Sequence, residues 1–580
     1  MTIRTSTLAS IALLGALVAP GCDSARTPQA VTPPAAQAAD VIYVGGDIVT
    51  VNDKQPTVEA LAVRDGRILA LGTRADIEKA NKGQATRVVD LAGKTLLPGF
   101  VDGHSHFFNS LLVAGQANLY PAPAGPGNDV PGIVAALTAF ATERKIPKGQ
   151  MIVGYGYDDS VMPKGRTLNR DDLDKAFPDN PVRVDHVSMH GTVLNSLALK
   201  HYGYSAATKT PPGGVIVRKP GTQEPYGLIM EMAFLPVVEK QEAMSAEQEV
   251  EASKAGQLLY ASYGITTAQE GATHLNQLEV LKRAAAGGAQ LIDVVAYPFI
   301  TDLDKTLAAY PVTTWGRYEK GLKIGGVKIT LDGSPQGRTA AFTTPYLTGG
   351  PAGQKNWKGE LGFPQEEANQ ILKQVYGLGV PVLIHANGDA AIDALLRAHE
   401  FAVAGEPAKE RNITAIHAQF IRKDQLQKFA EYRIRPSFYT LHTYYFAEAH
   451  TANRGAEQTA YISPMRDAID AGLHPANHTD FVVAPLDQMF VLWSSVNRIS
   501  RAGAVIGAGQ CVTPLEGIKA LTIWPAEMYG EQDAKGTLEA GKLADLVILD
   551  RNPLKVSKTD IKDIKVVETI KSGKTVYHAS

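Results

Sequence analysis

Residues 97–106 read LPGFVDGHSH, an apolar, strand-like run that ends in two histidines separated by one residue. In extended chain, alternate side chains point to the same side, so His104 and His106 can grip one metal ion together. A single His-x-His pair occurs often by chance and does not define a site. Its meaning depends on which residues the chain places at the ends of its other strands.

Seven further strand-like runs follow, and helical stretches separate most of them. Alternating strands and helices are typical of a parallel α/β fold, and eight such strands are the number found in a (β/α)8 barrel. The predicted strands are 97–102, 264–269, 292–297, 326–331, 381–385, 413–417, 434–439 and 473–478. The roughly 150 residues between the first and the second are too many for a loop, which predicts an insertion over about 110–256.

Both ends of the chain show short strands and turns instead. Residues 60–70 contain two strand-like runs around Asp65-Gly66, a pair that suits a tight hairpin turn. Similar runs fill residues 544–549 and 565–577. We therefore predict one small β-sandwich domain built from residues 40–97 and 536–580, beside a barrel over 98–535.

The first 22 residues have the layout of an export signal, with Arg4 followed by an apolar run over 8–19 that is too short to span a bilayer. The run ends in Ala-Pro-Gly-Cys22, which resembles the lipobox of bacterial lipoproteins, whose cysteine is acylated. Residues 23–39 are rich in Pro, Ala, Thr and Gln and are typical of a tether. We expect an exported protein, periplasmic or held at the membrane only by lipid on Cys22. Cleavage after Ala38, which would release a soluble periplasmic enzyme, is the alternative.

The amino-acid composition excludes several classes of function. The chain has 57 Lys and Arg against 59 Asp and Glu, so it lacks the basic excess that nucleic-acid binding requires. Its two cysteines exclude a disulfide framework and a cysteine-rich metal site. We find neither a phosphate-binding loop nor a convincing dinucleotide motif. A small-molecule substrate is expected, and a homodimer is left open.

Four more residues with metal-ligand chemistry fall at or near strand ends. Lys328 lies in the fourth predicted strand, His385 and His417 end the fifth and sixth, and Asp480 follows the eighth. The strands of a barrel point their carboxyl ends at one mouth, so these residues can converge with the histidine pair after the first strand.

These segments resemble the amidohydrolase superfamily, and in detail its family 3 branch, which includes N-substituted formamide deformylases. The matching stretches are LPGFVDGHSH (97–106), HGTVLNSLAL (190–199), GVKITLDGSPQGRTAAFTTPY (326–346), IHANGDAAID (384–393), HAQ (417–419), the neighbourhood of Asp480 and GTLEAGKLADLVILD (536–550). The resemblance covers nearly everything from residue 40 onward.

The resemblance implies a metal site. His104 and His106 match the ligands of the more buried metal, and His385 and His417 match those of a second. Lys328 matches a lysine that CO2 converts to a carbamate, an anion able to bridge two metals. The alternative is an unmodified Lys328 in a one-metal variant. Ligands without thiolate suit two Zn ions, and also Mn, Fe or Co.

Asp480 matches the carboxylate that touches the first metal and accepts a proton from bound water. The family usually has Gly-Ser-Asp around this position, whereas this chain has His478 two residues before the aspartate. His478 is either a partner of a ligand or a purely structural residue. His190, Arg338 and His442 sit where the resemblance implies contacts with the substrate.

The implied reaction is hydrolysis of a non-peptide, amide-like C–N bond, in an N-acyl, N-formyl or cyclic amide. A divalent ion lowers the pKa of bound water from about 16 to about 7, and Asp480 acts as the catalytic base. Two alternatives stay open. One is an ester, lactone or carbamate hydrolase that uses the same residues, and the other is a tethered binding or regulatory lipoprotein with a vestigial site.

Overall fold

The computed structural model describes residues 38–163, 166–187, 191–211, 214–240, 244–351 and 354–579. These residues belong to one compact unit that begins at Ala38. The predicted export signal and nearly all of the predicted tether lie outside the described residues. None of the helices within the described ranges is long and apolar enough to cross a membrane.

The middle of the chain forms two parallel sheets. The four-stranded sheet has the order β15-β14-β13-β6 and the five-stranded sheet the order β16-β17-β18-β19-β20. Their strands are β6 (Phe100–Val101), β13 (Ile265–Thr273), β14 (Asp293–Pro298), β15 (Leu322–Ile324), β16 (Val327–Thr330), β17 (Val382–Ala386), β18 (Ile413–His417), β19 (Arg435–Phe438) and β20 (Ala476–Asn477). Each of the eight predicted strands overlaps one of these, and β15 is an addition. The α/β class is confirmed, while closure of the barrel stays a prediction.

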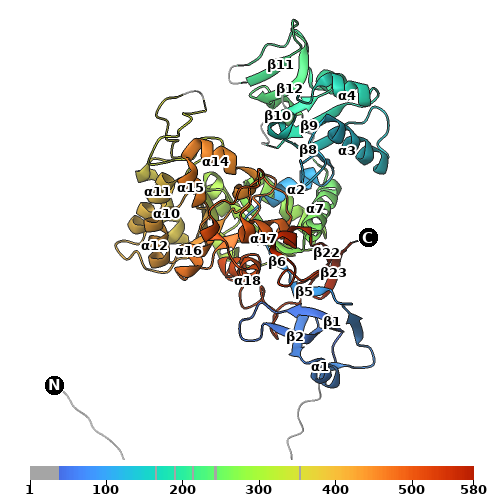
Figure 1. Ribbon diagram of the computed structural model, residues 1–580, viewed down its shortest axis with the longest axis vertical. Helices are drawn as coiled ribbons and strands as arrows, with labels where there is room; N and C mark the ends of the chain where they lie inside the picture. The colour runs from blue at the N-terminus through green and yellow to red at the C-terminus, as the bar shows by residue number, and fades with distance from the viewer. Residues whose placement is uncertain are drawn as a thin grey trace, which may run out of the picture. The chain divides into compact units, whose positions relative to one another are not determined.

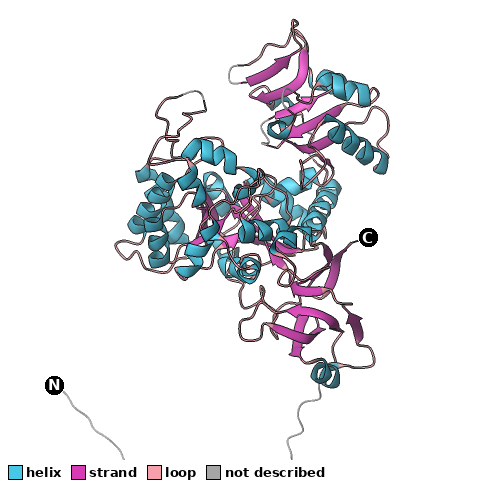
Figure 2. Ribbon diagram, in the orientation of Figure 1, coloured by secondary structure: helices cyan, strands magenta, loops and turns pink. Residues whose placement is uncertain are grey.

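Helices accompany these strands on both sides (Figure 2). The main ones are α2 (Phe107–Val113), α7 (Ala246–Ala261), α8 (Leu275–Ala286), α9 (Leu303–Ala309), α10 (Gln365–Leu378), α11 (Asp389–Ala402), α12 (Lys423–Tyr432), α13 (His442–Tyr445), α14 (Ala447–Arg454), α15 (Ala456–Ala460), α16 (Met465–Asp470), α17 (Gln488–Asn497), α18 (Pro514–Lys519) and α19 (Ile523–Met528). Every residue of β18 is buried, which is typical of parallel strands covered on both faces. Helix α10 ends where Gly379 takes a φ of +69°, a conformation that glycine adopts without strain.

The two ends of the chain share one eight-stranded sheet, drawn in blue and red in Figure 1. Its strands are β1 (Val41–Val49), β2 (Thr57–Arg64), β3 (Arg67–Gly72), β4 (Arg87–Asp90), β5 (Thr95–Pro98), β21 (Leu546–Leu549), β22 (Val566–Lys571) and β23 (Lys574–His578). Antiparallel pairing of β5 with β21 joins the two ends. Asp65 and Gly66 connect β2 to β3 with φ of +49° and +74°, as a tight primed turn requires. The hydrogen bonds link these strands into one continuous sheet, and its division into a sandwich stays a prediction.

A buried charge cluster ties this sheet to the parallel strands. Asp293, the first residue of β14, accepts hydrogen bonds from Lys535 at 2.5 Å and from Lys571 of β22 at 2.6 Å. Lys571 also donates to Asp545 at 2.7 Å. Both lysine side chains are at most 10% exposed, so each depends on its carboxylate partners for charge compensation.

The insertion after β6 has a six-stranded sheet of its own, in the order β11-β12-β10-β9-β8-β7. Its strands are β7 (Ala117–Asn118), β8 (Ile152–Tyr157), β9 (Val182–His186), β10 (Gly191–Leu194), β11 (Gly214–Arg218) and β12 (Pro225–Glu231), and its helices are α3 (Val130–Glu143), α4 (Arg170–Ala176), α5 (Ser196–Tyr202) and α6 (Leu235–Glu239). A separate apolar cluster packs under this sheet. Helix α7 begins at Ala246 and packs on α2 and α8, so the predicted insertion boundary at 256 falls inside a helix of the parallel part.

Candidate metal centre

Backbone hydrogen bonds bring the segment after β6 against the segment after β20. The amide of Asp480 donates to the carbonyl of His104 at 3.1 Å, and the amide of His106 donates to the carbonyl of Phe481 at 2.9 Å. These bonds fix Asp480 beside the histidine pair although some 375 residues separate them in sequence, as the convergence of parallel strands at one edge predicts.

The three side chains form a group with metal-binding geometry. One ligand atom from each of His104, His106 and Asp480 lies within 4.8 Å of the others. Asp480 Oδ1 lies 3.3 Å from His106 Nε2 and 3.6 Å from His104 Nε2. This oxygen is buried and has no hydrogen-bond partner in the structure. Because buried polar atoms are nearly always satisfied, the orphaned oxygen fits a cation held between the three residues.

The other predicted ligands lie next to this group. Lys328 Nζ is 3.1 Å from His104 Nε2, and His417 Nε2 is 4.0 Å from Asp480 Oδ2. The ring of His385 packs edge-on against that of His417, with centroids 4.6 Å apart. All six predicted metal-site residues are thus neighbours, and their imidazole and carboxylate donors suit a divalent ion such as zinc. Their roles as ligands stay predictions.

Burial sets the charge states of these groups. It lowers the pKa of Lys328 to about 7 and that of His385 to about 4. Burial, followed by the nearby lysine, holds the pKa of His104 well below its usual value. Burial acts to raise the pKa of Asp480, but the nearby His106 and the other surrounding imidazoles hold that pKa well below the usual value. His104, His385 and His417 are therefore neutral and Asp480 is ionised, the protonation states that metal binding requires. His106 differs, because burial lowers its pKa but the carboxylate of Asp480 raises it above the usual value, so metal binding there would release a proton.

Two of these residues have backbone conformations that side chains rarely adopt. His417 has a φ of +70° and Asp480 a φ of +54°. A non-glycine residue in the left-handed region costs on the order of 1–3 kcal/mol and persists where the surrounding structure imposes it. Such residues concentrate at functional sites, so the conformation supports a functional role at both positions.

Several polar residues behind the ligands were not predicted. Gln269 accepts a hydrogen bond from His104 Nδ1 at 2.5 Å, and Asp332 lies 3.5 Å from His385 Nε2. Ser437 contacts His478 Nδ1 at 2.9 Å. A signal for Gln269 and Asp332 was present, because each is a polar residue at or just after the carboxyl end of a predicted strand. His478 itself contacts His417 Nδ1 through its Nε2 at 3.1 Å, which favours a partner of a ligand over a purely structural residue.

The three residues predicted to contact the substrate differ in their surroundings. His190 lies outside the described residues. His442 packs against Tyr439 with ring centroids 4.4 Å apart, and its Nδ1 contacts His450 Nε2 at 2.9 Å. Arg338 has a φ of +61°, and its carbonyl accepts from the indole of Trp357 at 2.6 Å. Nothing in these contacts tests a role in substrate binding, which stays a prediction.

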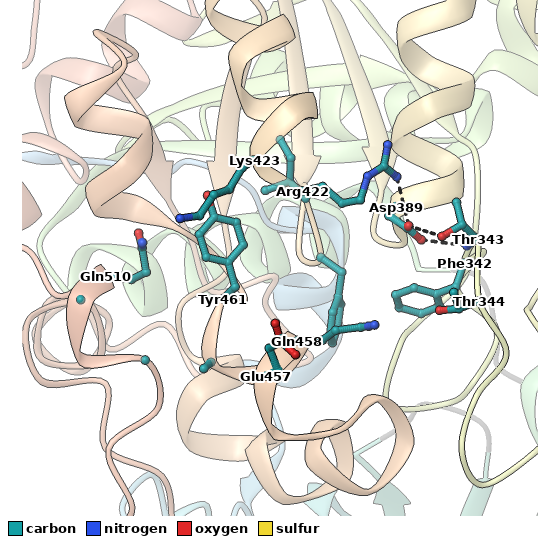
Figure 3. A pocket seen from close by; sticks show the side chains of 15 residues that line it. Phe342, Thr343, Thr344, Asp389, Arg422, Lys423, Glu457, Gln458, Tyr461 and Gln510 are labelled. Carbon is teal, nitrogen blue, oxygen red and sulfur yellow. Dashed lines mark hydrogen bonds and ion pairs between the residues drawn. The ribbon is translucent and has the colours of Figure 1, made fainter.

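A cavity of about 640 Å³ opens at the amino-terminal ends of α11 and α12 (Figure 3). Asp389 bonds both Thr343 and Arg422 along its rim. None of the six predicted metal-site residues lines it. Phe420, on its wall, packs against His450 with ring centroids 5.2 Å apart, so aromatic side chains stand between this cavity and His442.

The fold and the cluster are those expected of a metal-dependent hydrolase. The model of the amidohydrolase family matches residues 87–577, and the chain belongs to that family. It is therefore an enzyme of the amidohydrolase family, as the sequence motifs predict.

Its relatives include the N-substituted formamide deformylase of Arthrobacter pascens, which is 26% identical over 93% of this chain and 99% of that protein. The putative amidohydrolase YtcJ of Bacillus subtilis is 27% identical over 93% of this chain and 99% of its own length. The solved structure of an uncharacterized metal-dependent hydrolase from Pyrococcus furiosus covers 89% of this chain and 100% of that one, with a TM-score of 0.68 at 24% identity. At that identity the structure supports the fold alone.

Proposed function

We propose that this enzyme hydrolyses an amide-like C–N bond in a small, non-peptide molecule, such as an N-formyl, N-acyl or cyclic amide. The observation that carries the proposal is the group formed by His104, His106 and Asp480, with an orphaned carboxylate oxygen at its centre. The deformylase relative, which aligns over nearly the whole chain, supports a substrate of this class.

A divalent ion bound here would supply hydroxide at neutral pH and polarise the carbonyl of the substrate. The residues of the chain carry the proton from the attacking water to the leaving nitrogen. Asp480 is ionised at neutral pH and lies within 4.0 Å of three imidazoles, so it can take a proton from the attacking water. Once protonated, it returns that proton to the leaving nitrogen, which otherwise departs as a poor, anionic leaving group.

The proposal extends to two ions, zinc or a similar metal, bridged by a carbamate on Lys328. The lysine is only 2% exposed and its amine lies 3.1 Å from His104 Nε2. A bare ammonium ion cannot bind a metal, whereas a carbamate is an anion with two oxygen donors. His385 and His417, whose rings pack edge to face, would then hold the second ion.

We also propose a closed (β/α)8 barrel carrying a terminal β-sandwich, and export with a lipid anchor at Cys22. The motivation for export is the apolar run that ends in Gly21-Cys22. We expect a small-molecule substrate and, for the anchored protein, contact with the membrane surface, and a homodimer stays open.

A substrate screen tests the function. The purified, zinc-loaded protein is incubated with matched N-formyl, N-acyl, cyclic-amide, ester and lactone compounds, and release of amine, alcohol or acid is measured. Turnover of amides that disappears with chelator and with Asp480→Asn supports the proposal. Turnover of esters or lactones alone would instead support the alternative leaving group, and a chain that binds no metal would support the binding lipoprotein.

A further inference from the structure

Behind the metal-site residues, two chains of hydrogen bonds run from imidazole nitrogens to backbone carbonyls. One starts at His417 and ends at the carbonyl of Gly103, and the other starts at His104 and ends at the carbonyl of Asp102. The two carbonyls belong to consecutive residues of the segment that carries the histidine pair. Both chains of hydrogen bonds therefore end on the same backbone segment, Asp102-Gly103.

The direction of the first chain follows from its last member. The hydroxyl of Ser437 donates its single hydrogen to the carbonyl of Gly103 at 3.1 Å, because a carbonyl can only accept. Ser437 Oγ must then accept from His478 Nδ1, 2.9 Å away. A neutral imidazole carries one N–H, so His478 Nε2 is an acceptor, and the proton between it and His417 Nδ1 belongs to His417. The remaining nitrogen, His417 Nε2, is a bare lone pair facing Asp480.

The second chain gives the same result by different residues. Tyr529 donates its hydroxyl hydrogen to the carbonyl of Asp102 at 2.5 Å and accepts from Gln269 Nε2 at 2.7 Å. The amide of Gln269 is thereby oriented with its oxygen toward His104 Nδ1, 2.5 Å away. That nitrogen carries the proton, and His104 Nε2 is left bare, facing Lys328 and Asp480.

Burial fixes which atom donates and which accepts in both chains of hydrogen bonds. Ser437 and Gln269 are fully buried, His478 is 1% exposed and Tyr529 is 6% exposed. Reversing either chain would set two lone pairs or two hydrogens against each other, and leaving a buried polar group unpaired costs about 1–3 kcal/mol. An imidazole without such a partner distributes its proton between both nitrogens, and only one of those forms can bind a metal through Nε2.

We propose that Ser437 with His478, and Tyr529 with Gln269, are positioning residues that hold His417 and His104 in the tautomer whose Nε2 is ready for a metal ion. This inference rests on the metal site of the proposed function, and it adds which residues prepare that site before the ion arrives. None of the four needs to touch the substrate or the ion.

The test removes, from each chain of hydrogen bonds, the hydroxyl group farthest from the metal ligand, and it leaves the ligands themselves unchanged. Ser437→Ala and Tyr529→Phe each delete one hydroxyl group, so that the next residue can turn its proton the other way. Ser495→Ala and Tyr204→Phe are matched controls, because each deletes a buried hydroxyl that donates to a backbone carbonyl elsewhere, that of Leu492 or of Ala233. Zinc affinity is measured by competition with a chelator, without substrate, and thermal unfolding verifies that each variant folds.

We expect zinc affinity to fall about 10–100-fold in Ser437→Ala and Tyr529→Phe and to change by less than about 3-fold in the controls. A second pair of variants separates positioning from packing. His478→Gln can still accept from His417 and donate to Ser437, so it should bind zinc far better than His478→Leu. The visible spectrum of the cobalt-substituted protein, which reports the ligands around the ion, should change in His478→Leu and be preserved in His478→Gln.

Wild-type affinity in both Ser437→Ala and Tyr529→Phe would overturn the inference, and so would equal losses in the controls. Equal binding by His478→Gln and His478→Leu would also overturn it. Because all these measurements are made without substrate, a failure to hydrolyse any tested amide would refute the proposed function and leave this result standing on its own.

Discussion

The carbamate on Lys328 can be tested through its dependence on CO2. Only a neutral amine reacts with CO2, forming an N–C bond and releasing one proton. Burial lowers the pKa of Lys328 to about 7. At pH 7 about half of its amines are then neutral, against roughly 0.03% for a lysine of ordinary pKa, a gain on the order of a thousandfold. The structure therefore predicts modification at neutral pH and ambient CO2.

The experiment compares metal loading with and without CO2. Metal-free wild-type protein and Lys328→Ala are each given zinc in CO2-free buffer or in buffer with ¹³C-bicarbonate. We expect the wild type to bind about two ions per chain with bicarbonate and about one without it, because the bridging anion is missing. Lys328→Ala should bind one ion in both buffers, and a small added carboxylate should partly restore its activity. Carbon-13 spectroscopy should show a carbamate signal in the wild type alone.

Two results would refute this reasoning. One is a Lys328→Ala variant that binds two ions and keeps full activity. The other is a wild type that binds two ions in CO2-free buffer and shows no carbamate signal. Either would favour an unmodified lysine, and the first would move the mechanism to a site built from His104, His106 and Asp480 alone.

Three further predictions concern the base, the fold and the amino terminus. Asp480→Asn should keep its metal and lose about 10²–10⁴-fold in turnover, because an amide cannot accept the proton; near-normal turnover at neutral pH would assign the base elsewhere. Asp293→Asn removes one of two carboxylate partners from each buried lysine, because Lys571 keeps Asp545 and Lys535 keeps Glu531, and it should lower the free energy of unfolding by about 1–3 kcal/mol in urea titrations. The exposed Glu251→Gln should change it by less than about 0.5 kcal/mol, and equal effects would contradict the role of the buried cluster. Mass spectrometry of the mature protein should find an acylated Cys22 at its start, and a start at Ala39 or an intact Met1 would rule out the anchor.

The parallel strands were predictable because burial on both faces produces continuous apolar runs. Residues 413–417 were predicted as a strand with the bounds that β18 has in the structure. Strand β15 (Leu322–Ile324) was missed, because three residues are too few for a periodic pattern and two glycines follow directly. The sheet of the insertion was not predicted either, since its pairings depend on contacts between distant strands that a pattern within one strand does not encode.

The candidate ligands were predictable for a different reason. Parallel strands deliver their carboxyl ends to one place, so a histidine or aspartate at such an end can be assigned to the site without knowing any distance. The partners behind the ligands do not follow this rule. Tyr529 lies about 50 residues beyond the last parallel strand, directly after α19, and its hydroxyl donates to the carbonyl of Asp102 behind the site. Its contribution depends on packing in three dimensions, and the sequence contains no periodic signal for it.

His478 shows why a departure from a family pattern is informative. A glycine at this position has no side chain to offer, whereas the imidazole of His478 fills the space between His417 and Ser437 with contacts of 3.1 and 2.9 Å. The ring of His478 is therefore linked to a hydroxyl on the neighbouring strand and, through it, to the carbonyl of Gly103. His478→Gly should therefore weaken zinc binding in this chain, although glycine is the residue usual in the family. Without the ring, His417 Nδ1 would lose its acceptor and Ser437 its donor. Unchanged zinc affinity in His478→Gly would show that the ring only fills space.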